Sequence, residues 1–218
     1  MKDYLKQLLQ LFRKHYAEHR YAYISLMLAL FGIPLLYAYL SKSSVTVATL
    51  YVTMILVSMT VVLHVSTVGL RARHSFIMAN TLPVSTAVNY SFILLNSVIV
   101  AFVMVAVCYF PALAISKAIY PPMPEFDWAH DVFFGNGRTY LGVLATHGVL
   151  LIVNLVGKTR IFLAYLIALL LAIFVQILMS EYVAVEWREN VKLVGNILLI
   201  FVAWIGGYFI LRNYQIRS

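Results

Sequence analysis

The chain has 218 residues, of which 63% are hydrophobic and only 11% are charged, and its mean hydropathy is +0.90. A soluble domain carries about 25% charged residues, so the composition argues against a soluble protein and leaves no room for a separate catalytic domain. The formal charge of +8 fits basic cytoplasmic loops better than a nucleic-acid surface. The first apolar run follows a charged segment and is too long for a signal peptide, so we expect the mature protein to begin at or near Met1.

Residues 1–20 are predicted to form an amphipathic helix that lies in the cytoplasmic membrane interface. Its apolar side chains recur at helical spacing, and its basic side chains lie largely off that stripe. The residues expected to make this interface are Leu5, Leu8, Leu9, Phe12, Lys6 and Lys14, with Tyr16 on the same apolar stripe. The alternative is an ordinary solvated helix next to the membrane.

Six apolar runs follow, each long enough to cross the roughly 30 Å hydrocarbon core of a bilayer. We place these predicted spans at residues 21–40, 45–70, 87–109, 139–156, 161–180 and 191–211. The expected fold is therefore all-α, with an interface helix at 1–20 and a six-helix transmembrane domain at 21–218. Pro34 can kink the first span, and Gly206 and Gly207 allow a close helix approach in the last.

The charged residues between these spans predict the orientation of the chain. With both termini in the cytoplasm, the inner segments 1–20, 71–86, 157–160 and 212–218 sum to +9, and the outer segments sum to −1. This satisfies the positive-inside rule, whereas the opposite orientation violates it. Among the outer segments, 110–138 is rich in proline, which argues against a long regular helix. Residues 181–190 are acidic around Trp187 and predict a short interfacial piece.

Few residues within the predicted spans can carry chemistry. No Asp, Glu, Lys or Arg lies in the middle of a span, which argues against a proton-coupled transporter or a voltage sensor. His64 and His147 lie on different spans and could bind one haem or metal, or each could form hydrogen bonds within the bundle. The polar span residues Ser58, Thr60, Asn96, Asn154 and Gln176 are expected to form hydrogen bonds between helices.

The most informative segment is the predicted cytoplasmic loop 71–90. Its basic start is followed by a short, semi-apolar helix that ends at a proline, and Ser85 or Thr86 is expected to cap the next span. Apolar side chains on a solvent-exposed loop suggest that the loop binds in a groove of a partner protein, although it could instead pack on its own bundle. The candidate contact residues are Arg71, Arg73, Phe76, Ile77, Leu82, Pro83 and Ser85.

In this segment the sequence resembles the ABC-2 type transporter permeases common in Bacteroidetes-like bacteria. Leu82, Pro83 and Ser85 match the family's Leu-Pro-Ala-Ser motif after span two, whereas Val88 and Asn89 replace its following Glu-Lys. The general plan of about 220 residues, with an amphipathic start and six spans, is similar too.

The resemblance implies a half-transporter membrane subunit of the bacterial inner membrane. It would pair with itself or a second permease, and its loop 71–85 would dock on a separate ABC ATPase that binds ATP and Mg²⁺. This chain would then carry no cofactor and no catalytic residue, and would export an amphipathic substrate. The alternatives are a haem-binding membrane redox protein and a membrane scaffold or sensor subunit without transport activity.

Overall fold

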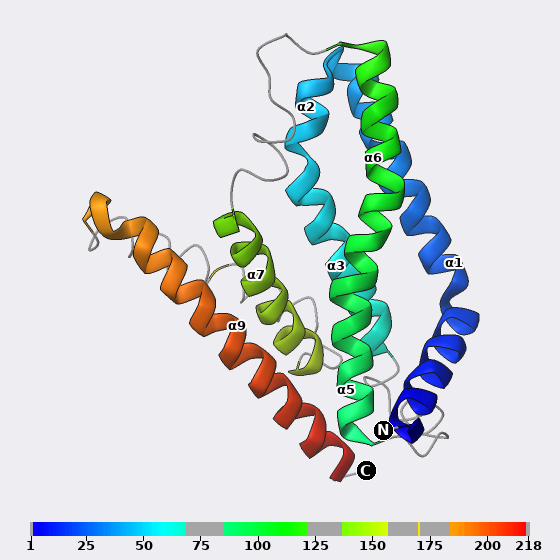
Figure 1. Ribbon diagram of the computed structural model, residues 1–218, viewed down its shortest axis with the longest axis vertical. Helices are drawn as coiled ribbons and strands as arrows, with labels where there is room; N and C mark the ends of the chain where they lie inside the picture. Colours follow the sequence, from blue (N-terminus) through cyan, green and yellow to red (C-terminus); the bar gives the residue numbers. More distant parts are fainter. Residues whose placement is uncertain (1, 69–84, 122–136, 157–169, 171–183, 217–218) are drawn as a thin grey trace. The chain divides into compact units, whose positions relative to one another are not determined.

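The computed structural model describes residues 2–68, 85–121, 137–156, 170 and 184–216 (Figure 1). Within these ranges the regular elements are all helices, and four helices are long and apolar enough to cross a membrane. They are Asp3–Ser41, Thr86–Ile119, Gly137–Val156 and Glu186–Asn213. These helices indicate an all-helical, membrane-embedded protein. The fifth predicted span, 161–180, lies outside the described residues except for Leu170.

The chain divides into two compact units. One unit comprises Met1–Ser66 and Ser91–Gly137, and the other comprises Thr67–Tyr90 and Arg138–Ser218.

The first unit begins with α1 (Lys2–Ser41), a single helix of 40 residues that bends at His19 (Figure 1). The bend separates the predicted interface helix from the first predicted span, because the backbone of His19 leaves helical geometry (φ −112°, ψ 18°). Pro34 was expected to kink this helix, but the non-helical dihedrals of α1 are at His19. A proline removes only one backbone hydrogen bond, which a membrane helix can tolerate.

The second predicted span, 45–70, is divided in the structure. A short helix, α2 (Ser44–Thr49), leads through Leu50 into α3 (Tyr51–Thr67), which has 17 residues. At the division the Leu50 N–H donates to the Val47 carbonyl at 3.0 Å, a tight i to i−3 bond. The divided run keeps its helical direction, but α3 alone spans only about 26 Å at the rise of an α-helix.

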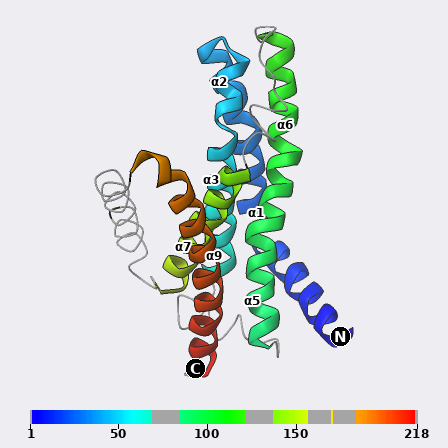
Figure 2. The same ribbon diagram turned by 60° about the vertical axis from the view of Figure 1, so that its left-hand side comes forward.

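The third predicted span is longer than expected. Helix α5 (Thr86–Leu94), the π-helical segment η2 (Leu95–Val100) and α6 (Ala101–Ile119) follow one another without a break (Figure 2). The expectation that the prolines of 110–138 prevent a long helix is wrong for Pro111, which lies inside α6. Ala112, Leu113 and Ser116 are buried just after it, so packing holds the helix together across the missing hydrogen bond.

The core of the first unit forms where α1 packs against α2 and α6, and α2 packs against α6. Its largest fully buried side chains are Leu30, Val47, Ile55, Met59, Val62, Leu63, Ile93 and Tyr109. Tyr109 also donates its hydroxyl to the Val47 carbonyl at 2.6 Å, which ties α6 to α2. A buried tyrosine usually finds such a partner, because an unpaired hydroxyl is costly in an apolar core.

The second unit contains α7 (Gly137–Val156) and α9 (Val185–Ile216), which run side by side (Figures 1 and 2). Gly148 of α7 faces Ala203 of α9, and Gly207 of α9 faces Leu151 of α7. The expected close approach in the last span is therefore confirmed for Gly207. It is not found at Gly206, where an added Cβ atom would meet no atom of the described chain within 4 Å.

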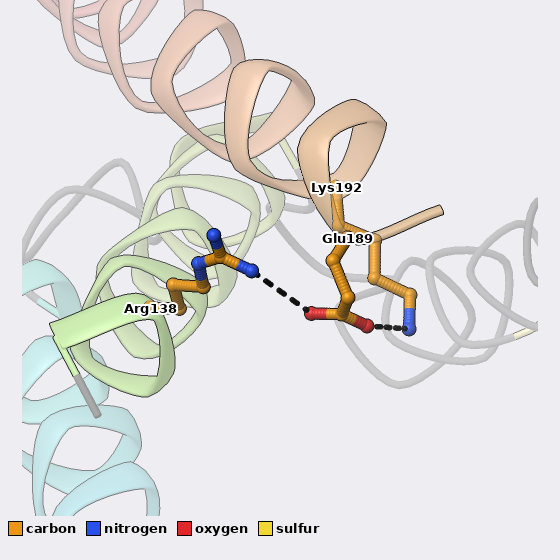
Figure 3. A network of polar contacts seen from close by, with 3 residues as sticks. All are labelled: Arg138, Glu189 and Lys192. Atoms are coloured by element: carbon orange, nitrogen blue, oxygen red, sulfur yellow. Dashed lines mark hydrogen bonds and ion pairs between the residues drawn. The ribbon is translucent and has the colours of Figure 1, made fainter. Parts of the chain in front are cut away.

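Two acidic residues of the predicted interfacial piece, Glu186 and Glu189, belong to the first turns of α9, and Glu181 lies outside the described residues. Glu189 lies 3.9 Å from Arg138 at the start of α7 and accepts a hydrogen bond from Lys192 at 3.1 Å (Figure 3). All three side chains are about half exposed or more, so each pair contributes about 0.2–1 kcal/mol at most. The trio adds little stability to the α7–α9 contact, which depends mainly on the apolar seam.

Candidate functional site

The predicted ATPase-contact residues lie almost entirely outside the described part of the chain. Arg71, Arg73, Phe76, Ile77, Leu82 and Pro83 all fall in the undescribed range 69–84. Ser85 is described and exposed, and its Oγ accepts a hydrogen bond from the Val88 N–H at 3.3 Å. Because α5 begins at Thr86, this is N-cap geometry, and the predicted cap at Ser85 is confirmed.

The N-terminal segment, residues 2–18 of α1, is the other predicted site. Leu8 is only 9% exposed, whereas Leu9 is 67% exposed and Leu5 is also exposed. Phe12 packs edge-on against Phe92 of α5, with ring centroids 4.9 Å apart. The predicted apolar stripe is therefore split, since one edge packs on the protein and the other faces outward. Lys6 is exposed, and Lys14 lies 3.9 Å from Glu18.

A cluster of buried polar side chains joins this segment to the rest of the first unit. Its centre is Asn96 of η2, whose side chain is fully buried. The Asn96 Nδ2 donates to the Tyr23 hydroxyl at 2.6 Å and to the Ser66 Oγ at 2.7 Å. The Tyr16 hydroxyl donates to the Asn96 Oδ1 at 2.6 Å. A fifth member, His15, lies with its Nε2 2.8 Å from the Tyr23 hydroxyl. We call these five residues the Asn96 cluster.

The cluster brings together three parts of the chain that are distant in sequence. Tyr16 and Asn96 are 80 positions apart, and Asn96 and Ser66 are 30 apart. Asn96 sits within the π-helical turns of η2, a geometry that is frequent at functional sites. Each hydrogen bond contributes about 0.5–1.5 kcal/mol net, and leaving any of these buried groups unpaired costs more.

Aromatic rings surround the His15 side of the cluster. The His15 imidazole lies 5.1 Å from the Phe92 ring and 4.7 Å from the His19 ring, measured between centroids. Close to the chain's start, the Tyr4 hydroxyl also donates to the Ser91 Oγ at 2.6 Å. The members of the Asn96 cluster offer neutral donors and acceptors but no carboxylate or amine. This chemistry suits the positioning of helices.

Sequence reasoning found only part of this cluster. It identified Asn96 as a polar residue that bonds between helices, which is confirmed, and it placed Tyr16 on an apolar stripe. It missed His15, Tyr23 and Ser66. A signal was present, because His15, His19 and Tyr23 recur at a spacing of four and so share one helix face.

The other polar span residues differ in their partners. Ser58 donates from α3 to the Ala101 carbonyl of α6 at 3.2 Å, as expected of a bond between helices. Thr60 instead donates to the Leu56 carbonyl of its own helix at 2.7 Å. Asn154 of α7 does both, since it donates to Leu150 and its Oδ1 lies 3.4 Å from the Thr67 Oγ1. Gln176 lies outside the described residues.

The two span histidines lie in different units. His64 belongs to α3 of the first unit and is half-buried. His147 belongs to α7 of the second unit, is fully buried, and meets the Trp204 ring edge-on at 6.3 Å. Each histidine therefore belongs to the helices of its own unit.

Comparison with known proteins identifies no relative. No family model matches the chain, nor does any curated protein or solved structure. What the sequence and the structure establish is a class, an all-helical membrane protein with several apolar helices.

Proposed function

We propose that this chain is the membrane-spanning permease subunit of an ABC transporter. Residues 71–85 carry the proposal, because a basic, semi-apolar stretch ends in Leu-Pro and leads into a new apolar helix. The N-cap bond of Ser85 supports it, since the segment then ends in a rigid helix start that can transmit force.

The proposed partner is a separate ABC ATPase, docked on Phe76, Ile77, Leu82 and Pro83, with Arg71 and Arg73 near its acidic rim. The chain would act as half of a homodimeric or heterodimeric unit in a bacterial inner membrane. The apolar composition supports an amphipathic substrate, such as a lipid or a lipid-linked precursor, which can reach the helices from the bilayer.

The experiment is co-expression with an ABC ATPase, first of all one encoded by a neighbouring reading frame, followed by affinity purification through the permease. Phe76→Ala and Leu82→Asp should release the ATPase or uncouple its turnover, since truncating an interface hot spot costs about 2 kcal/mol or more. Leu82→Met is the matched control, because it keeps the apolar volume and should retain the partner.

The six expected spans should still insert in these variants, because the loop lies outside the bilayer. We therefore expect both variants to lose the ATPase while they remain as abundant in the membrane as the unmodified chain. Full ATPase binding and full turnover in both Phe76→Ala and Leu82→Asp would contradict the proposal.

A further inference from the structure

The N-terminal segment is held to the first unit by both polar and apolar contacts. Tyr16 and His15 bond into the Asn96 cluster, and Tyr4 bonds to Ser91. The apolar part of the contact consists of Leu8, which is buried, and Phe12, which packs on Phe92, while Leu5 and Leu9 are exposed. Polar contacts of this kind can be exchanged for water or headgroup contacts at a modest net cost.

A hinge already exists at the inner end of the segment. The backbone of His19 is outside helical geometry, so α1 is already kinked there (φ −112°, ψ 18°). Immediately after it, the Arg20 guanidinium bonds to the Tyr21 hydroxyl at 3.0 Å and stacks on that ring. A rotation about His19 would leave the helical geometry on either side of the kink unchanged.

The outward face of the segment suits a membrane surface. Leu5 and Leu9 are exposed there, and Lys6 and Arg13 are exposed beside them. When positions are plotted at about 100° per residue, these four residues share an arc of about 100°, Glu18 lies on the other side of the helix, and Asp3 lies about 60° beyond Lys6. An amphipathic helix with basic and apolar residues is stable at a headgroup boundary.

We propose that the N-terminal segment is a hinged latch. In the docked state Tyr16 and His15 bond into the Asn96 cluster. In the undocked state the segment swings about His19 and buries its apolar stripe in the membrane interface. The inference does not depend on the ABC transporter assignment, because only contacts within the first unit carry it.

Spin labels on the full chain in lipid nanodiscs can measure the two states. Leu9→Cys on the segment and Val103→Cys on α6 are both exposed, and Cys108→Ala removes the single native cysteine. Electron–electron distance measurements should give one main distance in this background. Asn96→Leu, which keeps the branching of the side chain but loses its side-chain hydrogen bonds, should add a clearly resolved second distance.

A milder variant covers the case in which Asn96→Leu fails to fold. Tyr16→Phe removes one hydrogen bond and should raise the ratio of undocked to docked molecules about fivefold. Tyr109→Phe is the matched control, since it removes a buried tyrosine hydroxyl bond of 2.6 Å in the same unit but outside the cluster. Its distance distribution should equal that of the background.

Two results would overturn the latch. One is a single, unchanged distance in a folded Asn96→Leu protein or, where that variant does not fold, an unchanged distribution in Tyr16→Phe. The other is equal broadening in Tyr109→Phe, which would mean that any lost hydrogen bond loosens the unit.

Discussion

Gly148 of α7 lies so close to Ala203 of α9 that a Cβ atom built on the glycine would stand 2.8 Å from the Ala203 Cβ. Real Cβ atoms do not approach so closely, so the two helices can only keep this spacing with glycine at position 148. In a membrane there is little hydrophobic driving force between helices, and close packing at small residues takes its place. This contact therefore fixes the distance between α7 and α9.

The first prediction compares two glycine substitutions in these helices. Gly148→Ala should destabilise the protein by about 1–3 kcal/mol, because the methyl group must push α9 away. Gly206→Ala should be neutral or stabilising by up to about 1 kcal/mol, since alanine favours the helix and the described chain offers no clash there. Thermal unfolding in the same detergent measures both. Equal melting temperatures for the two variants would contradict the packing described here.

The second prediction concerns Lys42, which follows α1 with a left-handed backbone (φ 52°). Its Nζ lies 4.0 Å from the centroid of the Tyr39 ring and 5.7 Å from the centroid of the Tyr120 ring. Lys42→Ala should lose the cation–π contact, which stabilises the protein by about 0.5–1 kcal/mol. The alanine would keep the strain of the left-handed backbone. Lys42→Gly loses the same contact but relieves the strain, so it should be more stable than Lys42→Ala by about 1 kcal/mol. A glycine variant that is less stable than the alanine variant would refute this account.

The third prediction tests the helix cap that follows the proposed coupling segment. Ser85→Ala should cost about 1 kcal/mol, because the Val88 N–H loses its side-chain acceptor at the start of α5. Ser85→Thr is the comparison, since threonine keeps a hydroxyl acceptor at the N-cap. It should have the smaller effect on unfolding. Hydrogen exchange at the first turn of α5 should also rise in Ser85→Ala alone.

The fourth prediction concerns orientation in the membrane. In a Cys108→Ala background, a cysteine at Ser75 should react with a membrane-impermeant thiol reagent only after the cells are permeabilised. A cysteine at Ala129, in the proline-rich outer segment, should react in intact cells. The charge distribution predicts this pattern, because cytoplasmic loops carry an excess of Lys and Arg. Labelling of the cysteine at position 75 in intact cells would contradict the proposed topology.

Local properties of the sequence determined the class of this protein and several of its boundaries. The run predicted at 139–156 matches α7, and the boundary predicted after residue 20 falls beside the bend at His19. The helix cap at Ser85 could likewise be predicted from the sequence. Hydropathy, helix caps and turn residues act over one or two turns of chain, so nearby residues are enough to specify them.

Contacts between distant segments decided what the sequence could not. Asn96 was recognisable as a polar residue in an apolar run, but its partner Tyr16 lies 80 positions away. Both Gly206 and Gly207 permit a close helix approach, and only the crossing of α7 and α9 selects Gly207. Packing after Pro111 likewise carries α6 beyond the point where local propensity would end it. The composition and local pattern thus determined that these segments are membrane helices, while the tertiary structure decided which faces meet, because packing energy depends on neighbours that the linear order does not reveal.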